Sequence, residues 1–137
     1  MEIKESTIED YLNFKPSEPN IKEITAVTDA PLKVCMMTMW NSSLERYTVK
    51  HQCKTLCLLG VCEGNEFWVF FSKLDKLPLS FYRLAKEKIT GKPFHGKIYK
   101  ENIFAVKMIK FLGYEVTEPF PYGYKGELFM NFYRKET

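Results

Sequence analysis

The chain has 137 residues, the length of one domain, and its 45% of hydrophobic residues are enough to build a core. Its 20 basic and 17 acidic residues nearly balance, so charge does not signal a nucleic-acid partner. No apolar run approaches the ~20 residues that span a bilayer, and the charged N-terminus, Met1–Glu5, lacks the apolar core of a secretory signal. We expect a single domain, residues 1–137, that works in a cytoplasm.

The cysteines and histidines do not have the spacing of a metal site. No Cys-x-x-Cys pair occurs, and His51 and His95 lie far apart in the sequence. Separate buried thiols fit a reducing compartment better than a disulfide does. We therefore expect no metal and no disulfide from the four cysteines, which are Cys35, Cys53, Cys57 and Cys62.

The first third of the chain predicts one strand and two helices. Met1–Lys4 is β-prone, and Ser6–Glu9 has the spacing of a capping box that starts a short helix ending near Phe14. Pro16 and Pro19 disfavour helix at the residues before them. Asp29 is the expected N-cap of the second helix. This helix has an apolar stripe, predicted as core with a partner groove as the alternative, at Leu32, Cys35, Met36, Met39 and Trp40.

The middle of the chain has the composition of an antiparallel meander. Tyr47–Val49 is β-prone, and Thr55–Cys62 is a nearly continuous apolar run typical of a strand covered on both faces. Glu63–Asn65 supplies the Gly and Asn that a tight hairpin turn needs. The aromatic run Glu66–Phe71 is therefore predicted to be a central strand.

The last part of the chain alternates helices and strands. Pro78 begins a helix that reaches Ile89, and Asn102 begins another that ends at Gly113. The predicted strands are Phe94–Tyr99, Tyr114–Thr117 and Glu127–Arg134, with a loop at Pro119–Gly126. A meander followed by a strand–helix–strand crossover predicts an α/β (α+β) fold: a mixed, mostly antiparallel central sheet of about six to seven strands with helices on both faces.

The helix that begins at Asn102 points to a known family. Asn102, Ala105 and the Gly113–Tyr114 pair resemble the last helix of a GCN5-related N-acetyltransferase (GNAT) domain. The order of elements resembles the same superfamily over essentially the whole chain. The resemblance implies a GNAT-like fold whose ligands bind between two splayed strands, here Phe67–Phe71 and Phe94–Tyr99, beneath the aromatic loop Pro119–Gly126.

The cofactor loop of that family is altered here. In active relatives, a glycine-rich loop after the fourth strand presents backbone N–H groups to the pyrophosphate of acetyl-coenzyme A. The matching segment, Ser72–Ser80, has no glycine and contains a proline. The remaining cofactor-binding candidates are Lys73, Lys76 and Asn102, and helix capping is the favoured role of Asn102. We expect no cofactor, with acetyl-coenzyme A as the alternative.

The catalytic groups of the family are also changed. Ile109 stands where active relatives carry the Tyr that protonates the leaving thiolate, and an alkyl group cannot transfer a proton. The candidate catalytic residues are Glu66 as a base toward an amine and Tyr99 as a displaced acid, with Tyr82 and Tyr122 as further tyrosines.

A narrower resemblance concerns small acetyltransferase-like proteins of short-tailed bacteriophages, some of which are internal virion proteins. Its segments are Glu66–Ser72, Leu79–Ile89 and Asn102–Tyr114. Together with the glycine-free loop and Ile109, this resemblance implies a catalytically degenerate protein in the virion or host cytoplasm. Such a protein would contact other virion proteins or a host protein during assembly or DNA ejection. The alternative is an active acyl-CoA-dependent N-acetyltransferase that modifies a host protein or a small amine. A weaker alternative is an inhibitor of a host defence protein.

Overall fold

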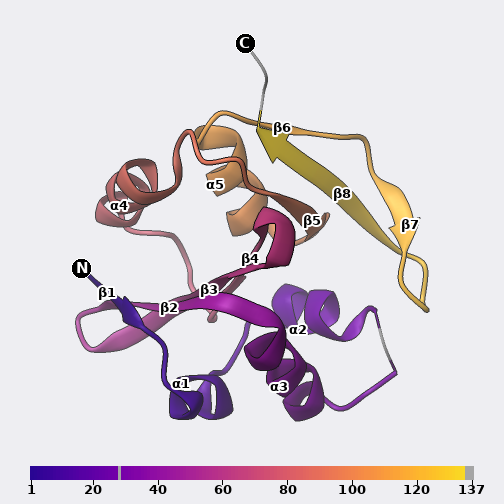
Figure 1. Cartoon of the computed structure of the whole chain (residues 1–137), viewed down its shortest axis with the longest axis horizontal. Coiled ribbons are helices and arrows are strands. Elements are labelled where there is room, and N and C mark those ends of the chain that lie inside the picture. The colour runs from indigo at the N-terminus through magenta and orange to yellow at the C-terminus, as the bar shows by residue number, and fades with distance from the viewer. Residues whose placement is uncertain (28, 135–137) are drawn as a thin grey trace.

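A computed structural model describes residues 1–27 and 29–134. Its strands form one eight-stranded sheet, and its helices pack against this sheet (Figure 1). In chain order they are β1 (Glu2–Glu5), α1 (Ile8–Asn13), α2 (Glu18–Thr25), α3 (Leu32–Ser42), β2 (Ser43–His51), β3 (Lys54–Cys62), the 3₁₀ turn η1 (Glu63–Asn65), β4 (Glu66–Phe71), α4 (Leu79–Ile89), β5 (His95–Tyr99), α5 (Ile103–Phe111), β6 (Tyr114–Val116), β7 (Phe120–Tyr122) and β8 (Glu127–Arg134).

The sheet has the strand order β1-β2-β3-β4-β5-β8-β6, and β7 pairs with β8 outside this path. Strands β4 and β5 run parallel, and every other pairing between the strands is antiparallel. The predicted mixed, mostly antiparallel sheet is therefore confirmed. Strand β8 lies between β5 and β6, which places the C-terminal strand inside the sheet.

Helices cover both faces of the sheet, as expected. Helices α1, α2 and α3 lie on one face, and α4 and α5 lie on the other (Figure 1). The aromatic strand β4 serves both cores because its side chains alternate between the faces. Phe67, Val69 and Phe71 pack in the core of α4 and α5, whereas Trp68 and Phe70 pack against the first three helices.

The boundary between β4 and β5, which we call the β4–β5 seam, is closed at one end and open along the rest. Glu66 pairs with His95, the one backbone pair recorded between these strands within the described residues. A Cβ atom on Gly96 would lie 2.5 Å from the carbonyl oxygen of Phe67, so glycine permits this close approach. Beyond Gly96 no further backbone pair joins the described residues of the two strands. The carboxyl ends of β4 and β5 are therefore joined by side chains instead of backbone bonds.

The N-terminal third contains a helix that the proline pattern did not predict. Helix α2 begins right after Ser17, with Pro19 in its first turn, where a proline costs no helical hydrogen bond. The capping box before α1 is shifted by one residue from the prediction, since Thr7 and Asp10 form it. Helix α3 begins as predicted, but Pro31 occupies its N-cap position and Asp29 does not cap it.

Other predicted segments also differ in detail. The predicted loop Pro119–Gly126 contains strand β7, which pairs with β8 to form a hairpin. Cys53 is exposed in the β2–β3 turn, whereas Cys35 and Cys57 are buried. Within the described residues, none of the four cysteines forms a disulfide. Within the described residues, no three metal-binding side chains converge. None of the described helices is both long and apolar enough to cross a bilayer.

Candidate functional site

Three buried polar side chains join the carboxyl ends of β4 and β5. The backbone N–H of Phe71, the last residue of β4, donates to Asn20 Oδ1 (3.1 Å), and that of Tyr99, the last residue of β5, donates to Glu23 Oε1 (2.6 Å). Asn102 Nδ2 donates to both acceptor residues, at 2.9 Å to Asn20 Oδ1 and 3.1 Å to Glu23 Oε2. We call this group the α2 clamp.

Local folding of α2 places two of the clamp residues. Asn20 and Glu23 are three residues apart and therefore lie on one helix face. The helix start is fixed against β4, because the Ser17 N–H donates to the Phe71 carbonyl at 2.9 Å. Asn20 Nδ2 also donates to Ser17 Oγ at 2.6 Å. Both backbone groups of Phe71 are thus bonded to the α2 region.

Glu23 is a buried carboxyl group whose charge no described residue neutralises. Only 9% of the residue is exposed, and among the described residues no ion pair reaches it. Burial raises the pKa of Glu23 to about 8, against the opposing effect of the bonds from Tyr99 N–H and Asn102. The Glu23 carboxyl group is therefore protonated at neutral pH, and its pKa lies in the range that is useful for acid–base chemistry.

A cavity of about 200 Å³ lies along the open part of the β4–β5 seam. Glu23 borders it, and Lys97 lies over the Tyr122 ring, 5.1 Å from its centroid. The hairpin that carries Tyr122 is attached to the end of α2 by a bond from Tyr124 N–H to the Ala26 carbonyl (3.1 Å). The remaining lining residues are Ile24, Val27, Met39, Glu66, Phe67, Trp68, Val69, Phe70, Ile98, Ala105, Ile109, Phe129 and Phe132.

Several solved structures that share this architecture are described as acetyltransferases. A GNAT-family acetyltransferase from Bacillus cereus superposes with a TM-score of 0.60 at 11% identity, covering 99% of this chain and 97% of its own. A candidate phosphinothricin N-acetyltransferase gives 0.65 at 11% identity, with 99% and 98% coverage. A candidate acetyltransferase from Salmonella typhimurium, solved with its cofactor acetyl-CoA, gives 0.61 at 14% identity, with 100% and 95% coverage.

This chain has the GNAT fold. The likeness covers its whole length, in agreement with the resemblance read from the sequence. No protein-family model matches the sequence, and no curated protein matches it either.

The GNAT fold separates the two predicted catalytic residues. Glu66 begins β4 and borders the cavity from an exposed position beside His95. Tyr99 ends β5, roughly 13 Å farther along at 3.3 Å per residue. Its hydroxyl lies 3.4 Å from Glu127 Oε2, and burial together with the charges of Glu127 and Glu101 raises the pKa of Tyr99. The structure therefore does not assemble these two residues into an acid–base pair.

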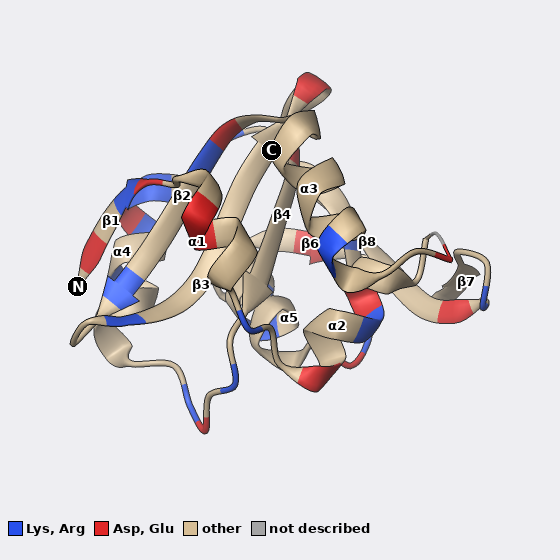
Figure 2. Cartoon of the chain, turned by 90° about the horizontal axis from the view of Figure 1, so that it is seen from below, with Lys and Arg blue, Asp and Glu red and all other residues tan. Residues whose placement is uncertain are grey.

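The predicted cofactor-binding residues are also dispersed. Lys73 and Lys76 are exposed on the loop between β4 and α4, which carries both basic and acidic residues (Figure 2). Among the described residues, neither lysine has a hydrogen bond or ion pair. Asn102 occupies the N-cap position of α5, but its side chain does not cap the helix and serves the α2 clamp instead. The capping role predicted for Asn102 is therefore wrong. Ile109 is buried, with 1% exposed.

Asn20 and Glu23 are functional candidates that the predicted elements did not indicate. Both lie on α2, which was not predicted because Pro16 and Pro19 were read as helix breakers. A signal was present: Ser17 followed by a proline two residues later is a common helix start, and Ile21 and Ile24 follow at helical spacing. That pattern would have placed Asn20 and Glu23 together on one helix face.

Proposed function

We propose that this chain uses the GNAT fold as a binding scaffold without transferring an acetyl group. In this proposal it is an acetyltransferase-like phage protein, virion-associated or accessory, that acts in assembly or DNA ejection by contacting other virion proteins or a host protein. The observation that carries the proposal is the α2 clamp, since its hydrogen bonds join the ends of the two strands between which the GNAT resemblance places a cofactor.

The hydrogen bonding of the clamp supports this proposal. An extended ligand between splayed strands needs free backbone groups at the strand edges. The Phe71 N–H and carbonyl and the Tyr99 N–H already have partners within the protein. A cofactor arm that passed between the strand ends would have to break these buried bonds, each at a cost of about 1–3 kcal/mol for an unsatisfied group.

The segment after β4 supports the same proposal. Ser72 is bonded to β3 through its N–H and hydroxyl, which donate to the Leu56 carbonyl at 2.9 and 3.1 Å. Pro78 occupies the N-cap position of α4. An anion site at a helix start depends on converging backbone N–H groups, which glycine favours and proline reduces. The two exposed lysines on this loop add charge without a fixed geometry.

Calorimetric titration of the full chain with acetyl-coenzyme A tests the proposal. We expect no saturable binding up to about 1 mM ligand, the weak end of measurable affinity. A matched pair of variants separates specific from diffuse attraction: K73A/K76A removes the loop charges, and K33A/K107A removes two exposed lysines on α3 and α5. Micromolar binding that K73A/K76A weakens and K33A/K107A does not would contradict the proposal.

The phage part of the proposal has its own test. Quantitative mass spectrometry of purified particles, from a phage that encodes this chain, should detect it at a fixed stoichiometry. A protein that is abundant during infection but absent from washed particles would limit the proposal to an accessory role in the host cytoplasm.

One observation favours the second candidate, an acyl-CoA-dependent N-acetyltransferase acting on a host protein or small amine. Glu23, with a pKa of about 8, borders the cavity at the β4–β5 seam, where it has the proton affinity of a general base. Incubation with acetyl-coenzyme A and host lysate should then produce a product heavier by one acetyl group, and E23Q should abolish it. E18Q, on the exposed part of the same helix, is the control.

A further inference from the structure

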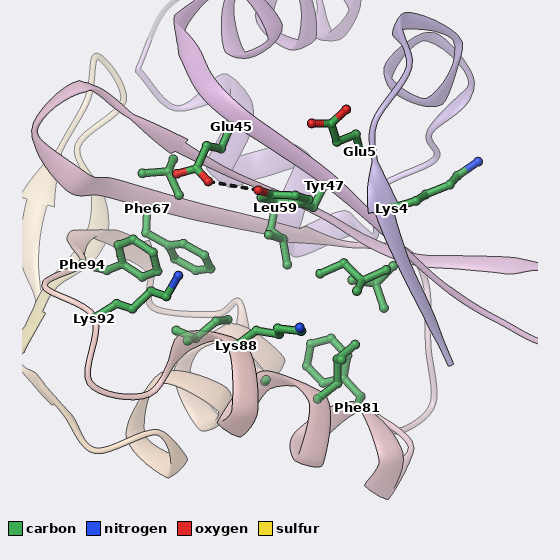
Figure 3. A pocket seen from close by; sticks show the side chains of 16 residues that line it. Lys4, Glu5, Glu45, Tyr47, Leu59, Phe67, Phe81, Lys88, Lys92 and Phe94 are labelled. Atoms are coloured by element: carbon green, nitrogen blue, oxygen red, sulfur yellow. Dashed lines mark hydrogen bonds between the residues drawn. The ribbon is translucent and has the colours of Figure 1, made fainter.

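A second and larger cavity lies between α4 and the sheet. Its volume is about 320 Å³, within the lower range of small-molecule sites. Strands β1, β2 and β3 form one wall and α4 forms the other (Figure 3). Phe67 borders both this cavity and the one at the β4–β5 seam, so the two cavities are neighbours.

The interior of this α4 cavity is hydrocarbon. Val49, Leu59 and Val61 come from the sheet, and Phe81, Ala85 and Ile89 come from α4; all six are buried in the main core. Such a surface offers water few hydrogen-bond partners. An apolar group that displaces this water would therefore bind favourably. The other apolar lining residues are Ile3, Tyr47, Phe67, Leu84 and Phe94.

Charges at the mouth of the α4 cavity are divided between its two sides. Lys88 and Lys92 extend from the α4 side toward the opening, whereas Lys4 points away from it (Figure 3). Glu5 and Glu45 lie on the β1–β2 side. The Tyr47 hydroxyl donates to Glu45 Oε1 at 3.0 Å, which partly satisfies that carboxylate.

The two lysines are free to receive an anion. Within the described residues, the recorded ion pair of Lys88 is a long contact of 3.9 Å with its exposed neighbour Glu87, and Lys92 Nζ has none. Such exposed pairs contribute little stability, so a ligand would replace this one at low cost.

We propose that the α4 cavity binds an amphiphile with one anionic head group. The chemical class that fits is a medium-chain fatty acid. The hydrocarbon chain lies between Leu59, Val61 and Ile89, and the carboxylate meets Lys88 and Lys92. Glu5 and Glu45 on the other side repel a second anionic group and therefore select for one head group. This site lies outside the α2 clamp and does not depend on the proposed scaffold function.

The test is an NMR titration of the isotope-labelled full chain with octanoate, octylammonium and 1-octanol. We expect saturable methyl shifts concentrated on Leu59, Val61 and Ile89, with octanoate binding about threefold more tightly than octylammonium, the effect of a partly exposed ion pair. Val34 and Leu44 are exposed and lie outside the cavity, so their methyl groups report non-specific binding.

Two double variants test the role of charge, and one single variant tests the role of the cavity volume. K88Q/K92Q should remove the preference for octanoate, whereas K86Q/K107Q, with the same change in net charge at exposed positions outside the cavity, should keep it. A85L should fill the cavity and abolish binding of all three ligands. If A85L fails to fold, the lysine pair still decides.

Four results would overturn the proposal, three of them with the wild-type chain. Those three are the absence of saturable shifts, shifts that spread over the exposed methyl groups instead of the cavity, and equal affinities for the three head groups. Undiminished binding to a folded A85L variant would also overturn it, because the ligand would then lie elsewhere.

Discussion

Glu23 is the residue with the least ordinary environment in this chain. Both of its oxygens accept hydrogen bonds, as a carboxylate would, yet no cation lies within ion-pair distance among the described residues. Burial outweighs the hydrogen bonds and raises its pKa to about 8. The folded protein therefore binds a proton at Glu23 more readily than the unfolded chain does, where an ordinary Glu titrates near 4.3.

This difference predicts a pH-dependent stability. The stabilisation that depends on neutral Glu23 is complete below about pH 4 and is lost as the pH rises through about 8. Urea unfolding from pH 5 to pH 8 should show the free energy of unfolding of wild type falling relative to E23Q, with an upper limit of about 1.4 kcal/mol per pH unit. The free energy of unfolding of E18Q should change with pH in parallel with that of wild type. If the E23Q curve were also parallel to wild type, Glu23 would not be the source of the pH dependence.

Asn102 should be far more sensitive to truncation than an exposed asparagine. N102A removes the donor shared by Asn20 and Glu23 and leaves two buried acceptors with one bond fewer each. We expect a loss of about 2–4 kcal/mol in the free energy of unfolding. N41A, at an exposed position of α3, should lie within about 0.5 kcal/mol of wild type. Equal effects of the two substitutions would show that the clamp is not a stabilising network.

At the scale of elements, most of the fold could be predicted from the sequence. Strands β3 and β4 follow from the uninterrupted apolar and aromatic runs, and their turn follows from Gly64 and Asn65, which both adopt positive φ. Helix α2 could not be predicted by treating Pro19 only as a helix breaker. Because α2 supplies two of the three clamp residues, missing one helix concealed the centre of the candidate site.

The contact between the β7–β8 hairpin and α2 gives a prediction at this scale. A Cβ atom on Gly123 would lie 2.1 Å from the Ala26 carbonyl oxygen, whereas one on Gly126 would meet nothing within 4 Å. Both glycines have positive φ, at 79° and 66°, so alanine strains each backbone similarly.

G123A should therefore destabilise the protein by about 1–3 kcal/mol more than G126A. It should also accelerate hydrogen exchange at the Tyr124 N–H, which donates to Ala26. G123A and G126A differ in that only G123A introduces a clash with the Ala26 carbonyl. Similar hydrogen-exchange rates at the Tyr124 N–H in both variants would therefore show that the contact with Ala26 does not hold the hairpin in place.

At the scale of the whole molecule, the cysteines report on folding. Cys53 is exposed in a turn, whereas Cys57 is fully buried in the central sheet, where burial raises the pKa of its thiol. A thiol reagent analysed by mass spectrometry should label Cys53 at once and Cys57 at the rate of global unfolding. Labelling of Cys57 under native conditions as fast as that of Cys53 would show that the sheet opens locally.

The β4–β5 seam has a mechanical consequence. The N-terminal strand β1 and the C-terminal strand β8 lie on opposite sides of the seam, so tension applied between the chain ends must cross it. A ladder of backbone bonds would share that tension, but here it passes through the Glu66–His95 pair and the side chains of α2. When the molecule is pulled by its ends, β4 and β5 should therefore separate first. The force needed should be lower than the force that separates β2 from β3.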